Sequence, residues 1–151
     1  MDLNLTEEQR IIQNSAREFL AIEGLNVARD AEQTAEGYSV LLWQKMAELG
    51  WMGLSFPEAY EGNGGDFVDL VLVLEEMGRV LVPGPFIPSV LCSGHALLRY
   101  GSERQRKEYL PRLTKGKLLI APAFIPPDST EGAKVEERAE REKKKAKLQA
   151  A

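Results

Sequence analysis

The sequence predicts an all-α protein, an up-and-down helical bundle followed by a charged C-terminal helix or disordered tail. Apolar residues recur at three- and four-residue spacing in five segments, which is the period of a helix with one buried face. The connections between these segments are short and rich in Gly and Pro. A length of 151 residues holds one ordinary domain and little more.

The first helix is expected to begin after Thr6, which forms a candidate capping box with Gln9. A second helix is expected over 40–49, capped by Ser39 and stopped by Gly50. Residues 26–37 between them are polar and without a strong period, so they predict a loop or a weak helical continuation.

The third helix, over 67–82, begins after a candidate cap at Asp66 and is so apolar that it should lie at the centre of the core. The glycine cluster at 62–65 precedes it. Neither a P-loop lysine pattern nor a preceding strand accompanies this cluster, so it predicts a loop between helices in preference to a phosphate cradle.

The last two helices are expected over 89–100, with Pro88 tolerated in the first turn, and over 103–114, capped by Ser102. A Pro-Gly-Pro turn at 83–85 precedes the first of them. The apolar run 118–124 follows the second and predicts the start of a strand.

Composition limits the classes of function. Hydrophobic residues make up 44% and charged residues 28%, with a formal net charge of -4, which gives no reason to expect a nucleic-acid partner. The single cysteine excludes an intramolecular disulfide framework. No apolar run is long enough for a membrane span and the N-terminus is too polar for a signal peptide, so we expect a cytoplasmic protein.

Four motifs occur in a fixed order along residues 5–120. They read LTEEQR with AREF at 5–19, LGWMGL with PEAYEGNGG at 49–65, LEEMGR at 74–79, and YGSERQRKEYLPRLTKGKL at 100–118. Together they resemble the N-terminal helical domain of the acyl-CoA dehydrogenases. We therefore expect a helical domain over 1–120, a broken-off junction to a missing β domain over 121–129, and a charged tail over 130–151.

This resemblance implies a FAD-dependent oxidoreductase that dehydrogenates the α,β-bond of an acyl-CoA thioester. In that family a glutamate base from the C-terminal domain removes the α-proton, and the flavin accepts a hydride. The chain is thus expected to supply an acyl-pocket wall and subunit contacts, no catalytic residue, and no activity alone. Its expected partners are acyl-CoA and either further copies of itself or a chain with the missing domains. The alternative is a free-standing helical association module without redox chemistry.

Residues 86–92 are the predicted wall of the acyl pocket. The segment VPGPFIPS at 82–89 resembles the pocket-forming turn of family members that take bulky acyl chains. Phe86, Pro88, Ser89 and Cys92 are therefore the candidates for contact with substrate.

The junction departs from the family pattern. The family's (Y/F)-x-x-T-E-P aligns without gaps on residues 122–127, where this chain has Pro122, Ile125 and Pro126 in place of the aromatic, the threonine and the glutamate. Proline and isoleucine side chains offer no hydrogen-bond donor to a flavin. FAD is therefore implied by the resemblance alone, and no cofactor-binding residue is assigned.

Cys92 and His95 would lie on one helical face, which allows a nucleophile–base dyad, although their apolar neighbours favour packing. His95 has no cysteine or carboxylate at ligand spacing, so no metal site is expected.

The tail at 131–147 is dense in Glu, Lys and Arg, which predicts a solvated helix or a disordered segment. A partner-binding helix, or a basic contact through residues 143–147, is the alternative.

Overall fold

The computed structural model describes residues 4–24 and 26–123. Every regular element within these residues is a helix: the α-helices are α1 (Glu7–Glu23), α2 (Val27–Ala31), α3 (Val40–Glu48), α4 (Phe67–Arg79), α5 (His95–Tyr100) and α6 (Glu103–Thr114). Two 3₁₀ turns, η1 (Trp51–Gly53) and η2 (Glu58–Tyr60), and one π-helix, η3 (Phe86–Gly94), complete the set. The predicted junction beyond 123 and the charged tail lie outside the described residues.

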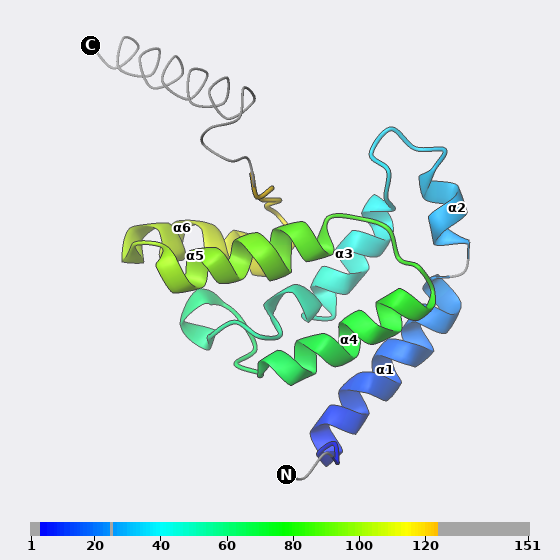
Figure 1. Cartoon of the computed structure of the whole chain (residues 1–151), viewed down its shortest axis with the longest axis horizontal. Coiled ribbons are helices and arrows are strands. Elements are labelled where there is room, and N and C mark those ends of the chain that lie inside the picture. The colour runs from blue at the N-terminus through cyan, green and yellow to red at the C-terminus, as the bar shows by residue number, and fades with distance from the viewer. Residues whose placement is uncertain (1–3, 25, 124–151) are drawn as a thin grey trace.

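The helices form the predicted up-and-down bundle. α1 and α4 lie side by side, and η3 continues directly into α5, which packs against α6 (Figure 1). The long helices alternate in direction from α1 through α3 and α4 to α5 and α6 (Figure 1). The all-α class is therefore confirmed for the described residues.

Side-chain caps fix where the helices begin. Thr6 Oγ1 accepts from the Gln9 amide at 3.1 Å while Gln9 Oε1 accepts from the Thr6 amide, so the predicted capping box is present. Ser39 caps α3, and Asp66 and Ser102 cap α4 and α6. These caps satisfy backbone donors that a helix leaves unpaired, and all four were predictable from the sequence.

Three predicted elements differ in the structure. Residues 118–123 have no regular structure, so the predicted strand is wrong for that part of the run; the Ile120 amide bonds the hydroxyl of Ser89 instead of a neighbouring strand. α4 ends at Arg79, because Leu81 takes a left-handed conformation with φ of 54° and is 72% exposed. The helix expected from residue 89 begins at Phe86 as the π-helix η3.

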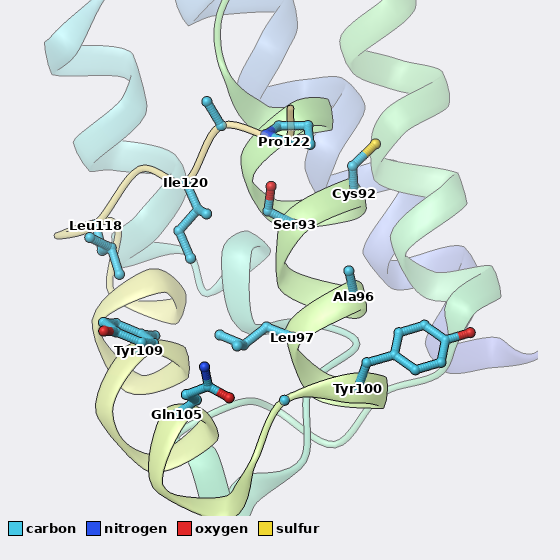
Figure 2. A pocket seen from close by; sticks show the side chains of 12 residues that line it. Cys92, Ser93, Ala96, Leu97, Tyr100, Gln105, Tyr109, Leu118, Ile120 and Pro122 are labelled. Carbon is cyan, nitrogen blue, oxygen red and sulfur yellow. The ribbon is translucent and has the colours of Figure 1, made fainter. Parts of the chain in front are cut away.

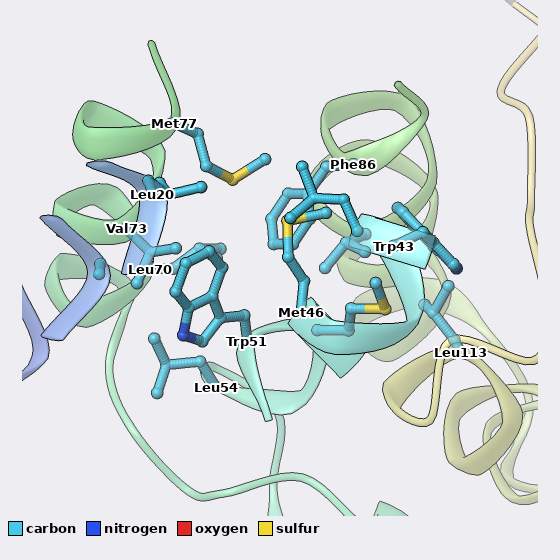
Figure 3. Close-up of a cluster of buried hydrophobic side chains, with 14 of the residues drawn as sticks. Leu20, Trp43, Met46, Trp51, Leu54, Leu70, Val73, Met77, Phe86 and Leu113 are labelled. Atoms are coloured by element: carbon cyan, nitrogen blue, oxygen red, sulfur yellow. The ribbon is translucent and has the colours of Figure 1, made fainter. Parts of the chain in front are cut away.

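Buried apolar side chains from α1, α3, α4 and η3 form one core cluster (Figure 3). Trp51 lies between Leu70 of α4 and Met46 of α3 in this cluster (Figure 3). Its indole meets the ring of Phe19 edge-on at 5.4 Å, and Trp43 meets Phe86 edge-on at 6.3 Å. The core therefore fixes the start of η3 relative to α3.

Two of the sequence motifs meet in an ion pair between α1 and α4. Glu76 of α4 is 1% exposed and accepts from Arg17 Nη2 at 2.8 Å and from Arg17 Nε at 3.2 Å. Arg79 Nε lies 3.3 Å from the same carboxylate. The hydrogen bonds from Arg17 hold the pKa of Glu76 below its ordinary value, although burial opposes them. Arg17 of AREF and Glu76 of LEEMGR thus join two helices and are structural residues.

The glycine cluster forms the predicted loop. The Gly64 and Gly65 amides donate to the carbonyls of Phe56 and Leu54, both at 2.9 Å, which folds the loop back onto the preceding turns. A Cβ at Gly62 would lie 2.1 Å from the Phe56 carbonyl oxygen, so no larger residue fits there. Because the backbone amides of Gly64 and Gly65 donate to carbonyls of the preceding turns, they are not available to bind a phosphate.

Candidate functional site

η3 and α5 form one continuous helical rod, Phe86 to Tyr100, which we call the η3–α5 rod. An apolar groove, which we call the α5 groove, opens between this rod and α6. It has a volume of about 770 Å³ and is open to solvent. The rod contributes Cys92, Ser93, Ala96, Leu97 and Tyr100, and α6 with the preceding turn contributes Gly101, Gln105 and Tyr109 (Figure 2). The segment Leu118, Ile120, Ala121 and Pro122 forms the remaining wall. This volume is in the usual range of small-molecule sites.

The lining is mostly apolar, and its polar side chains are partly engaged. Ser93 Oγ donates to the Pro88 carbonyl at 2.9 Å, within the rod. Gln105 Oε1 accepts from the Ser102 amide at 2.8 Å, as part of the α6 cap. Tyr100 is 79% exposed at the rim. The arrangement suits an apolar chain better than a polar or charged ligand.

Two hydrogen bonds anchor the segment that forms the third wall. The Ile120 amide donates to Ser89 Oγ at 2.9 Å, and Ser89 itself is 1% exposed. Upstream, Trp43 Nε1 donates to the Gly116 carbonyl at 3.0 Å. The backbone after α6 is therefore held against both η3 and α3.

The four predicted pocket residues lie in different places. Cys92 lines the α5 groove, and Ser89 lies behind its wall. Phe86 is buried and borders a second apolar cavity of about 320 Å³ beside Met77 of α4, whereas Pro88 is exposed. The structure brings only Cys92 of this set into the larger groove, and contact of all four with substrate stays a prediction.

Sequence reasoning missed the other lining residues. Leu97 and Tyr109 lie within the helices predicted over 89–100 and 103–114, and helical periodicity does not indicate that they face a groove. The apolar run 118–124 predicts the start of a strand and gives no sign of the groove, because an apolar run does not indicate which surface it will cover. One signal was available: a tyrosine-containing family motif directly follows the predicted pocket helix.

His95 does not pair with Cys92. Its Nε2 lies 2.9 Å from Ser55 Oγ, and its ring stacks on Phe56 at 4.9 Å and meets Phe67 edge-on at 5.9 Å. Burial lowers the pKa of His95, so the imidazole is neutral at physiological pH. These contacts agree with the packing interpretation of His95.

Ile120 and Pro122, at the described start of the junction, offer no free backbone N–H to a flavin. Pro122 lines the groove without an N–H, and the Ile120 amide is already bonded to Ser89. Ile125 and Pro126, the other two departures, lie outside the described residues.

Neither a metal cluster nor a membrane helix is found in 4–24 and 26–123. No three His, Cys, Asp or Glu side chains gather there as ligands of one metal ion. Over the same residues, all helices are too short or too polar to cross a bilayer.

The fold and the groove define an all-helical domain with an apolar groove beside α6. The model of the family described as "Acyl-CoA dehydrogenase, N-terminal domain" matches residues 6–117. The chain therefore belongs to the acyl-CoA dehydrogenase family and contains its N-terminal helical domain.

Characterised relatives agree with this assignment. The chain is 35% identical over 130 residues to the acryloyl-CoA reductase (NADH) of Anaerotignum propionicum, covering 85% of this chain and 33% of that protein. It is 33% identical over 131 residues to the short-chain-specific acyl-CoA dehydrogenase of Clostridium acetobutylicum, covering 85% and 34%. The chain thus spans about a third of the length of the curated relatives it matches.

Solved structures show the same fold. The acyl-CoA dehydrogenase of Bacillus anthracis, solved in complex with FAD, superposes with a TM-score of 0.73 at 32% identity over 83% of this chain and 22% of that one. A chain of the ChsE4–ChsE5 complex of Mycobacterium tuberculosis also reaches 0.73, at 22% identity over 80% of this chain and 34% of that one, which shows the fold alone.

Proposed function

We propose that this chain acts as the N-terminal helical domain of a FAD-dependent acyl-CoA dehydrogenase-like oxidoreductase, which dehydrogenates the α,β-bond of an acyl-CoA thioester. Its contribution is one wall of the acyl-chain site, at the α5 groove, together with subunit contacts. The observation that carries this proposal is an apolar groove of about 770 Å³, built from residues 92–109 within the family match and from residues 118–122 just beyond it.

The groove residues bind and shield the chain of the substrate. Cys92, Ala96 and Leu97 offer apolar contact along one side of the rod. Each methylene that leaves water contributes about 0.8 kcal/mol, so a few buried methylenes are enough for a measurable preference for acyl-CoA over CoA. FAD supplies the hydride acceptor when bound. We assign neither its binding nor the catalytic base to the described residues.

The single cysteine allows a direct test on the full chain. Octanoyl-CoA should slow alkylation of Cys92 by iodoacetamide about threefold when present at twice its Kd, whereas CoA without an acyl chain should not. Ala96→Arg places a long charged side chain at the groove and should abolish the protection. Ala21→Arg, a matched change at an exposed alanine of α1, should leave it intact. Equal protection by CoA, or none by octanoyl-CoA, would contradict the proposal.

The second candidate is a free-standing association module. Large apolar side chains lie exposed on the described surface, among them Ile22, Leu41 and Phe67, and such side chains favour contacts between chains. Visible flavin absorbance, gained on mixing with chains that supply β and C-terminal domains, would favour the dehydrogenase. A colourless chain that gains none would favour the module. A cytoplasmic location belongs to the first proposal as an expectation.

A further inference from the structure

We propose that Ser89 is a positioning residue: its hydroxyl holds the segment 118–122 against η3 and thereby forms the third wall of the α5 groove. Its role in binding rests on the proposed function of the groove. Its role in holding the segment does not.

Burial and hydrogen bonding single out Ser89. It is 1% exposed, and buried hydroxyls are retained where they have a partner. Its Oγ accepts from the Ile120 amide at 2.9 Å, across 31 residues of sequence. Ser93, one turn further along the rod, donates instead to the Pro88 carbonyl within the rod. Of the two rod serines near the groove, only Ser89 therefore reaches the segment.

The segment needs such a partner because it has no regular structure. Residues 118–123 belong to no helix or strand, and Leu119 is exposed. Backbone bonds from neighbouring strands or turns, which fix most extended segments, are absent from the described residues at Ile120. The hydroxyl of Ser89 takes the place of a strand carbonyl, as the acceptor for a backbone donor that would otherwise lose its partner.

The consequence for the groove follows from which residues flank Ile120. Leu118, Ile120 and Pro122 all line the groove, and in Figure 2 they extend along one side of it, opposite Cys92 and Leu97. Releasing Ile120 would free the middle of this wall while the upstream bond between Trp43 and Gly116 remains. The width of the groove, and with it the contact area for an apolar chain, thus depends on one hydroxyl.

Amide hydrogen exchange on the full chain tests the positioning role. In Ser89→Ala the Ile120 amide should exchange about fivefold to tenfold faster than in the wild type, the change expected for the loss of one hydrogen bond. Ser89→Thr keeps a hydroxyl and should restore part of the protection. Ser93→Ala, the matched control, should leave Ile120 unchanged. The Val73 amide in the buried helix α4 reports global unfolding and should change less than Ile120 in every variant.

Binding is measured separately, as protection of Cys92 by octanoyl-CoA. Ser89→Ala should weaken this protection at least threefold in Kd, because a freed wall buries less of the chain, while Ser15→Ala, at an exposed serine of α1 outside the groove, should not. Unchanged exchange at Ile120 in Ser89→Ala, or equal acceleration at Ile120 and Val73, would overturn the positioning role. Faster exchange with unchanged protection would overturn its link to binding. A wild-type protein that octanoyl-CoA never protects would count against the proposed function alone, since the exchange result stands without it.

Discussion

The buried carboxylate of Glu76 gives the sharpest stability prediction. Glu76→Gln keeps the shape of the side chain but replaces one oxygen by an NH₂ group. Arg17 donates to both carboxylate oxygens, so in either orientation the new amide donor meets a guanidinium donor. We therefore expect a loss of unfolding free energy at neutral pH.

The magnitude follows from the burial of the partners. A hydrogen bond to a charged group contributes about 1.5–3 kcal/mol, and Glu76 loses at least one. Because the Arg17 side chain is 49% exposed, its guanidinium regains water, which lowers the cost below that of a fully buried pair. The net loss is about 2 kcal/mol, which corresponds to a fall of about 8 °C in Tm for a domain of this size.

Thermal and denaturant unfolding, followed by circular dichroism, measure this loss. Glu75→Gln is the matched control: Glu75 bonds Arg79 at 2.9 Å on the exposed side of α4, so its loss should be below about 0.5 kcal/mol. The pKa of Glu76 is lowered in the folded state, so its stabilisation is present above the ordinary carboxyl pKa and is lost as pH falls through the lower folded value. The difference between wild type and Glu76→Gln should shrink accordingly in acid. Equal Tm values for the two variants at neutral pH would refute the reasoning.

Three further predictions follow. Gly62→Ala should destabilise the fold by about 2–3 kcal/mol, because its Cβ would meet the Phe56 carbonyl. Gly78→Ala, where a Cβ meets nothing within 4 Å, should instead stabilise α4 by about 0.5–1 kcal/mol. Denaturant unfolding compares the two variants, and equal effects on the unfolding free energy would contradict the packing argument. Burial lowers the pKa of His95, so unfolding free energy should fall as pH drops below about 6.5, and His95→Gln should flatten that dependence; an unchanged slope would show that another group titrates. The exposed apolar side chains should cause self-association at micromolar concentration, and a clean monomer in sedimentation would count against it.

Much of the helical framework could be predicted because its signals are local. Thr6, Ser39, Asp66 and Ser102 cap the helices that follow them, since a cap depends on residues three positions apart. The left-handed conformation of Gly50 likewise ends α3 where a glycine is expected.

The candidate site was less predictable because the residues that form it lie far apart in the sequence. The residues of the α5 groove come from three segments, and only Cys92 among the four proposed contacts lines it. Nothing local distinguishes Ser89, which bonds Ile120, from Ser93, which bonds within the rod. Val71 and Leu81 belong to the apolar helix predicted over 67–82 for the centre of the core, yet both are exposed, which depends on what packs beside α4.

The sequence by itself determined the family, the helical class and the starting residues of the four capped helices, because periodicity, caps and motifs act within a few residues of each other. Only the tertiary structure decided that Arg17 reaches Glu76, that His95 turns to Ser55 away from Cys92, and that the backbone at Ile120 closes an apolar groove. Such contacts join residues 31 to 59 positions apart, and they form only after the core has fixed how the helices pack.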